Sequence, residues 1–357
     1  MRGAVLFHYS KCTLLCQFET RMNLWHLCPI LAYNTMRCQS HAIVSKGKKM
    51  NNTKICVLGG DTRQLTLAQC LARSGYETAL WGLPYPDSND TVSAYCGNHN
   101  CVRCADPESA LRGSSAVILP LPSTVDGVRV NCPTIHTSDV KNGTDLRLIR
   151  LMEWMPKSAL LLAGKATDLM RSMAREENIR IIDYYDLEEI QMKNAIPTVE
   201  GAIEIALKEL PITLFESECI ILGYGRIGKR LAHILRALGA NVTVCARSEK
   251  DLTGARIVGC KALRLSDFQA NPCASDVLFN TIPTNILTAE MLEVLPKRTL
   301  IIELASAPGC MDTRTQKKCR QKFIRASSLP GKIAPITAGR ILFESIEQIL
   351  KQEGVLP

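Results

Sequence analysis

Residues Gly223 to Gly228 read G-x-G-x-x-G, a glycine spacing that could bind a dinucleotide. Apolar residues 218–222 precede this loop, residues 227–238 have helical spacing, and residues 241–245 read as a second strand. In such a unit the first glycine makes the turn, the second lets the backbone approach a pyrophosphate, and the third lets helix and strand pack closely. Unpaired amides at the helix start then meet the phosphates. We predict cofactor contacts at Gly223, Gly225, Arg226, Ile227 and Gly228; the alternative is a glycine-rich turn without a ligand.

The cofactor type is indicated by Ala246-Arg247-Ser248, which ends the second strand of this unit. An NAD site usually has Asp or Glu at this point for the ribose hydroxyls. Arginine suits a 2′-phosphate instead, because the guanidinium offers charge and a forked pair of donors, and serine adds a hydroxyl donor. We therefore predict NADP rather than NAD, bound by Arg247 and Ser248. A solvated Arg247, or one stacked on the adenine, is the alternative.

A third part of the cofactor site is expected at Asn280-Thr281-Ile282-Pro283, directly after an apolar strand over 277–280. Ligands of doubly wound folds collect at the carboxyl ends of the strands. Thr281 and Pro283 are therefore predicted to lie near the nicotinamide ribose, with an ordinary strand-ending turn as the alternative.

A second strand-to-helix turn, Gly59-Gly60-Asp61-Thr62-Arg63-Gln64, lacks the third glycine of a dinucleotide loop. A helix N-terminus that carries an arginine suits a carboxylate. We predict that Gly60 and Arg63 bind the substrate, the alternative being a plain helix start.

Proton transfer by a histidine is not expected, because His233 is the one histidine after the glycine loop and it lies within the predicted helix. Lys165 and Lys332 instead follow predicted strands, where they could bind carboxylates or move protons. They are predicted as catalytic residues, although most lysines are surface residues without such a role.

The stretch that contains Cys96, His99, Cys101 and Cys104 includes one C-x-x-C pair, and no second pair exists in the chain. Its ligands are cramped for zinc, so we predict a loop of reduced thiols and no metal site, with zinc as the alternative. The chain has 16 cysteines, scattered along its length and partly within apparent core elements. Reduced, buried thiols of a cytoplasmic protein are the better interpretation.

The elements that position these residues alternate between strand and helix, which is typical of parallel sheets covered on both faces. With 357 residues, two domains are expected. We predict an α/β protein with two Rossmann-like, doubly wound parallel-sheet domains in a glycerate-dehydrogenase-like arrangement. Its parts are a substrate domain over 50–193, a connecting helix over 194–212, an NADP-binding domain over 213–334, and a C-terminal helix over 335–357 that packs back on the first domain.

Residues 1–49 show no helical or strand periodicity and no signal-peptide core, so we interpret them as disordered or as a mis-assigned start before Met50. They hold seven basic residues and one acidic residue, and therefore six of the nine net positive charges. A nucleic-acid-binding body is not supported by the charge that remains. No apolar run approaches the ~20 residues that span a bilayer, so no membrane contact is expected.

Several separated motifs, taken in order, resemble the A-subunit family of dipicolinate synthase from endospore-forming bacteria. The resemblance extends from about Lys54 to the last helix and leaves the leader and the cysteine stretch outside the family pattern. Its motifs are residues 194–202, 222–229, 279–283, 304–309 and 329–335.

The resemblance implies NADP-dependent oxidation of a dihydrodipicolinate-type precursor from the lysine pathway to pyridine-2,6-dicarboxylate. It also implies a flavoprotein-like B-subunit of dipicolinate synthase as partner and a place in the mother cell during sporulation, with a homo-oligomer possible. The small dicarboxylate would need cationic and amide partners, in agreement with Arg63, Lys165 and Lys332; Glu200 and Ser306, within family motifs, are added to the substrate site. Another NADP-dependent dehydrogenase of a small carboxylate and a dinucleotide-sensing regulatory protein remain the alternatives.

Overall fold

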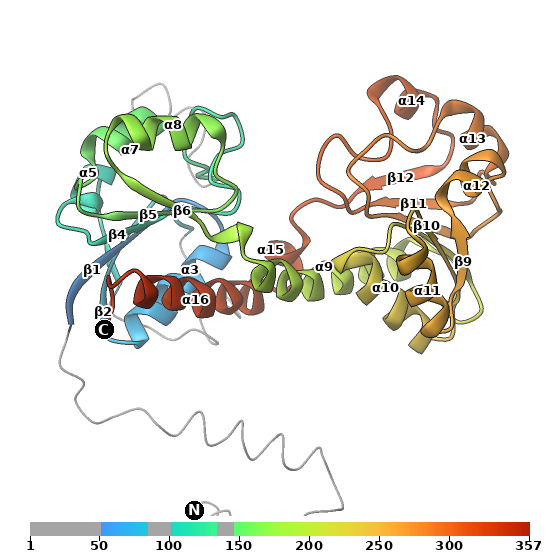
Figure 1. Cartoon of the computed structure of the whole chain (residues 1–357), viewed down its shortest axis with the longest axis horizontal. Coiled ribbons are helices and arrows are strands. Elements are labelled where there is room, and N and C mark those ends of the chain that lie inside the picture. Colours follow the sequence, from blue (N-terminus) through green and yellow to red (C-terminus); the bar gives the residue numbers. More distant parts are fainter. Residues whose placement is uncertain (1–50, 85–100, 134–145) are drawn as a thin grey trace, which may run out of the picture. The chain divides into compact units, whose positions relative to one another are not determined.

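The computed structural model describes residues 51–84, 101–133 and 146–357, and the chain divides into residues 1–49 and residues 50–357. Within the described part the chain forms two parallel six-stranded sheets, each with helices on both faces (Figure 1). None of the helices in these residues combines the length and the apolar character that a membrane crossing requires. The prediction of two Rossmann-like domains is confirmed.

The first sheet has the strand order β3-β2-β1-β4-β5-β6, with parallel pairing throughout. Residues of β1 alternate between two cores, Ile55 and Val57 on one face and Cys56 and Leu58 on the other. Its elements are β1 (Asn51–Leu58), α3 (Thr62–Arg73), β2 (Tyr76–Trp81), β3 (Cys101–Arg103), α5 (Pro107–Leu111), β4 (Ala116–Ile118), α7 (Leu148–Trp154), β5 (Leu160–Ala163), α8 (Asp168–Glu176), β6 (Arg180–Asp183) and the 3-10 turn η1 (Tyr184–Asp186).

The second sheet has the order β12-β11-β10-β7-β8-β9. Numbered along each domain, both sheets have the strand order 3-2-1-4-5-6 of dinucleotide-binding folds, so each has a topological switch point beside its first strand. The elements of the second domain are β7 (Glu218–Leu222), α10 (Arg226–Ala237), β8 (Asn241–Ala246), α11 (Glu249–Ile257), β9 (Lys261–Arg264), α12 (Leu265–Ala270), β10 (Val277–Asn280), α13 (Ala289–Val294), β11 (Leu300–Glu303), α14 (Thr313–Lys318) and β12 (Lys322–Arg325).

A long helix, α9 (Glu188–Glu209), joins the two sheets in the chain. The prediction that this helix begins with the Asn194–Pro197 segment is wrong, because Pro197 lies inside it. Proline removes one helical N–H, yet the helix continues on both sides: Ile190 is fully buried in the first core and Val199 in the second. Burial of these side chains outweighs the local preference for a helix start at proline.

The last helices return to the first domain. α16 (Pro335–Gln352) packs on α3, and a Cβ on Gly339 would lie 2.5 Å from Thr66 Cβ, so a residue without a side chain allows this close approach. The short α15 (Leu329–Ile333) contacts α9, where Gly201 faces Leu329 and Ile333.

Candidate functional site

The predicted dinucleotide loop lies between β7 and α10, and each of its glycines has a distinct environment. Gly223 has φ +97°, and a Cβ there would be 2.5 Å from Thr281 Oγ1. A Cβ on Gly228 would be 2.2 Å from the Gly223 carbonyl oxygen. At Gly225, by contrast, a Cβ would meet no described heavy atom within 4 Å. The loop therefore has a tight turn, a close helix–strand contact and one open position, as a pyrophosphate requires.

Hydrogen bonds hold this loop at the switch point of the second sheet. The Gly223 amide donates to the Cys245 carbonyl at 2.8 Å. From the neighbouring strand β10, the Thr281 amide and hydroxyl both donate to the Leu222 carbonyl, at 2.9 and 2.8 Å. Gly225 is the N-cap of α10 and offers no capping side chain. The first amides of a 12-residue helix therefore face the open position at Gly225 and suit an anionic ligand.

Arg226 opens α10 but directs its guanidinium to Glu188 in the first turn of α9. Arg226 Nε donates to Glu188 Oε1 at 2.7 Å, and Nη2 donates to Oε2. This hydrogen-bonded pair lowers the pKa of the exposed Glu188 carboxyl. Since the guanidinium already has this partner, a cofactor contact by the Arg226 side chain stays a prediction.

The end of β8 presents Arg247 to solvent, and among the described residues no side-chain partner is found for it. Ser248 is the N-cap of α11: its hydroxyl donates to Asp251 Oδ2 at 2.8 Å and accepts from the Asp251 amide at 3.1 Å. Glu249, the nearest acidic residue, forms ion pairs with Arg256 and Arg264 at 2.8 and 2.9 Å. The Glu249 carboxylate is thus neutralised by two arginines, while the guanidinium of Arg247 is available to bind an anion.

A pocket of about 200 Å³ joins the loop to one face of α9. Its α9 residues follow helical spacing, so they share a face, and sequence reasoning passed over them although Asn194 and Thr198 lie in a family motif. Tyr185, just before the helix, was also missed. The lining residues are Tyr185, Gln191, Asn194, Ala195, Thr198, Gly225, Arg226, Ile227 and Thr281.

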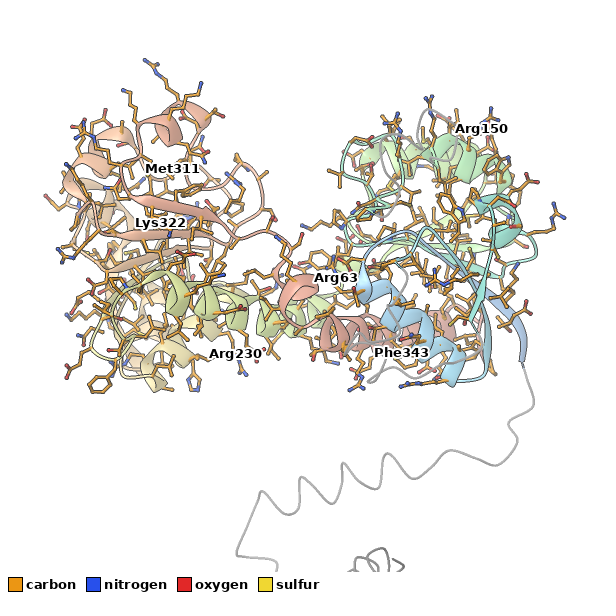
Figure 2. All side chains as sticks on the ribbon, turned by 180° about the vertical axis from the view of Figure 1, so that it is seen from behind. Arg63, Arg150, Arg230, Met311, Lys322 and Phe343 are labelled. Atoms are coloured by element: carbon orange, nitrogen blue, oxygen red, sulfur yellow. The ribbon has the colours of Figure 1, made fainter. Side chains whose placement is uncertain are left out.

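In the first domain, the turn between β1 and α3 is filled by its own side chains. A Cβ on Gly60 would lie 2.6 Å from Gln64 Oε1. Arg63 is buried; Nε and Nη2 donate to the Asp61 carboxylate at 2.8 to 3.1 Å, and Nη2 also donates to the Leu121 carbonyl at 2.7 Å (Figure 2 marks Arg63 on α3). Gly331 of α15 packs closely against this pair. A Cβ added to Gly331 would lie 2.8 Å from Asp61 Oδ2 and 2.9 Å from Arg63 Nε. Carboxylate binding by Gly60 and Arg63 stays a prediction.

Lys165 follows β5 in the left-handed backbone region, at φ +60°. Its ammonium lies 5.2 Å from the centroid of the Tyr185 ring and 3.4 Å from Ser306 Oγ. The structure therefore brings together two predicted residues, Lys165 and Ser306, and places them beside a ring that lines the α9 pocket.

Three other predicted residues lie apart from that pocket. Lys332 and Pro283 are exposed, on α15 and after β10. Glu200 lines a separate open groove with Ile203, Glu204, Leu207, Lys208 and Ile234. Its helical position, two residues beyond Thr198, directs it to another side of α9.

The cysteine stretch is only partly described, since Cys96 and His99 lie outside the described residues. Cys101 begins β3, which corrects the prediction of a thiol loop at this point: backbone pairing with β2 extends the sheet edge. Burial raises the pKa of the Cys101 thiol to about 11. Within residues 51–84, 101–133 and 146–357 no cluster of three potential metal ligands occurs.

Comparison with known proteins agrees with this geometry. Residues 54–185 match the family described as the N-terminal domain of the dipicolinate synthase A-subunit, and residues 199–314 match the D-isomer specific 2-hydroxyacid dehydrogenase NAD-binding domain. The A-subunit of dipicolinate synthase from Bacillus subtilis (strain 168) is 29% identical over 303 residues, covering 85% of this chain and 97% of the relative.

Solved structures give the same result. The A-subunit of the Bacillus subtilis synthase superposes with a TM-score of 0.71 at 29% identity, covering 85% of this chain and 97% of that one. The A-subunit from Bacillus halodurans superposes with a TM-score of 0.73 at 27% identity, covering 85% and 99%. Apo D-lactate dehydrogenase from Escherichia coli, at 12% identity and a TM-score of 0.53 over 85% and 97% of the chains, shares the fold alone.

These matches cover both domains, and the second match is to a dehydrogenase-type dinucleotide-binding domain that contains the Gly223–Gly228 loop. The predicted resemblance to the dipicolinate synthase A-subunit is therefore confirmed, and residues 54–185 match the model of its N-terminal domain.

Proposed function

We propose that the chain is an NADP-dependent oxidoreductase that converts a dihydrodipicolinate-type precursor to pyridine-2,6-dicarboxylate as the A-subunit of a dipicolinate synthase. The Bacillus relatives are A-subunits of dipicolinate synthase, and they align over most of this chain. This similarity supports the proposed activity. The observation that carries the oxidoreductase part is the open Gly225 position at the start of α10. The proposal includes a flavoprotein-like B-subunit as partner and a place in the mother cell, as the resemblance implies.

The residues of the second domain fit a dinucleotide. The α10 amides would hold the pyrophosphate, Gly225 leaves room for its approach, and Thr281 lines the same pocket. When bound, the cofactor accepts a hydride at its nicotinamide ring. NADP is favoured over NAD because Arg247 has no described side-chain partner, and because Glu249 is neutralised by two arginines. Ser248 contributes less, since its hydroxyl already caps α11.

The substrate carries two carboxylates, and Lys165 with Ser306 offers an exposed cation and a hydroxyl 3.4 Å apart to receive one of them. The precursor loses one hydride and one proton as its ring becomes aromatic. Because aromaticity favours this loss, a strong base is unnecessary, and water can take the proton while the Lys165 ammonium holds the carboxylate. Lys332 and Arg63 are further cationic candidates, but Arg63 would have to share its guanidinium with Asp61.

The test is an absorbance assay on protein started at Met50, with NADP and freshly generated dihydrodipicolinate precursor, with and without the B-subunit. We expect the reduced-nicotinamide and dipicolinate bands to appear together. Cofactor binding without turnover, even with the B-subunit present, would contradict the proposal and favour another carboxylate substrate or a dinucleotide-sensing role.

A further inference from the structure

A buried carboxylate, Asp183, lies at the carboxyl end of β6 and outside the predicted site residues. Its side chain is only 4% exposed. It accepts backbone N–H donors from two loops: Lys165 at 3.0 Å, Ala166 at 2.6 Å and Tyr185 at 2.9 Å. The nearest cation, Arg171, lies 3.5 Å away and also pairs with Asp186. The Asp183 carboxylate is therefore used mainly to organise backbone.

The loop after β5 is constrained from its other side as well. Gly164 donates its amide to Ser123 Oγ at 2.8 Å, and the Ser123 amide donates to the Gly164 carbonyl at 2.8 Å. A Cβ at Gly164 would lie 2.5 Å from the hydroxyl of Tyr184, which is itself bonded to the Leu119 carbonyl. The backbone of Lys165 is therefore defined by contacts on both sides.

The backbone of Lys165 has φ +60°, a conformation that residues other than glycine rarely adopt. Such outliers persist where surrounding contacts over-determine them, and they concentrate at functional sites. Here the result is specific: the ammonium is placed over the Tyr185 ring at 5.2 Å and beside Ser306. The same Tyr185 lines the pocket that reaches Gly225 and Thr281.

We propose that Asp183 is a positioning residue for substrate binding: by bonding the amides of Lys165, Ala166 and Tyr185, it holds the Lys165 ammonium on the Tyr185 ring, ready to receive a carboxylate of an acidic ring substrate. The identity of that substrate rests on the proposed function. A carboxylate bound by Lys165 lies next to the pocket at the dinucleotide loop, so Asp183 affects binding without touching the substrate.

The experiment measures dipicolinate and NADPH affinity by calorimetry for the full chain and its variants. Asp183→Asn keeps the size of the side chain but removes its charge. It is expected to weaken dipicolinate binding about tenfold and to leave NADPH binding within about twofold of wild type. Asp276→Asn is the matched control, because Asp276 Oδ2 also accepts a backbone amide, from Glu218 at 2.9 Å, but at the start of β10. It should change neither affinity.

A second substitution separates positioning from a general structural role. In a Lys165→Met background, Asp183→Asn should have little further effect on dipicolinate binding, because the two residues act as one unit. An equal loss in both backgrounds, or unchanged affinity in Asp183→Asn alone, overturns the proposal. If Asp183→Asn does not fold, Tyr185→Leu replaces it: a loss of affinity that requires Lys165 supports the arrangement, and a loss independent of Lys165 overturns it.

Amide hydrogen exchange distinguishes this proposal from the proposed function. Wild-type protein that binds NADPH but not dipicolinate would overturn the proposed substrate, and with it the carboxylate at Lys165. The organising role is then decided by exchange in segments 164–168 and 184–187. Exchange there should be faster in Asp183→Asn than in wild type, with no change in segment 223–228; equal rates would overturn it.

Discussion

The two strand-to-helix turns after β1 and β7 occupy the same place in two sheets of the same topology, yet they differ in what fills them. After β1, Gly60 meets Gln64, and Asp61 with Arg63 closes the helix start. After β7, a Cβ on Gly225 would meet no atom of the described residues within 4 Å. Topology therefore provides an equivalent place in each domain, while local side chains decide which of the two is open to a dinucleotide.

The largest effect is expected for Gly228→Ala. Its Cβ would lie 2.2 Å from a backbone oxygen, which cannot move without shifting β7 from α10. We expect a loss of about 3 kcal/mol or more in the free energy of unfolding, together with loss of NADPH binding. Denaturant unfolding and NADPH fluorescence titration measure the two effects. Wild-type stability in this variant would show that the turn is not closely packed.

Gly225→Ala should separate binding from stability. Its φ is −80° and its Cβ would have no described neighbour, so unfolding should be nearly unchanged. The methyl group would occupy the path of the pyrophosphate, and we expect a loss of about 2 kcal/mol in dinucleotide affinity. Tight NADPH binding by this variant would contradict the assignment of the open turn.

Arg247→Ala sharpens the same comparison at the far end of the cofactor. NADP binding should weaken by about 1–3 kcal/mol through lost charge-assisted hydrogen bonds, and NAD binding should change much less. Parallel titrations with both cofactors measure the difference. Equal weakening would remove the basis for NADP specificity.

The first turn should respond in the opposite way. Gly60→Ala places a Cβ at φ +97° and against Gln64, so we expect a loss of about 1–2 kcal/mol in stability. NADPH affinity should stay at the wild-type value. A matching loss of NADPH affinity would mean that both turns serve the cofactor, and the contrast between them would no longer hold.

The smallest effect is expected from the Arg226–Glu188 pair, which is exposed to solvent. The pKa of Glu188 is lowered from 4.5 in the folded protein, so its stabilising contribution is present above pH 4.5 and is lost as the pH falls through the lowered pKa. Wild type and Glu188→Gln should therefore differ slightly in unfolding free energy at neutral pH and converge in acid. A difference that grows on acidification would contradict this sign.

Much of the fold could be predicted because buried parallel strands are continuous apolar runs. β7 and β10 have the predicted bounds, and β8 extends one residue beyond the predicted range 241–245. The short strands β3, β9 and β12 were missed; β9 and β12 each have an exposed charged residue at both ends and two half-buried residues between them. Such edge positions gain their strand conformation from pairing with a neighbour, a contact that local sequence does not contain.

The sequence by itself determined the doubly wound class, the open dinucleotide loop and the resemblance to the A-subunit family, because glycine spacing and apolar periodicity are local signals. Only the tertiary structure decided that Arg63 faces Asp61, that α9 begins at Glu188, and that Asp183 joins the loops of Lys165 and Tyr185. The ring of Tyr185 and the hydroxyl of Ser306 are 20 and 141 residues from Lys165 along the chain. Contacts over such separations depend on strand order and packing, which are set by the whole chain rather than by any one segment.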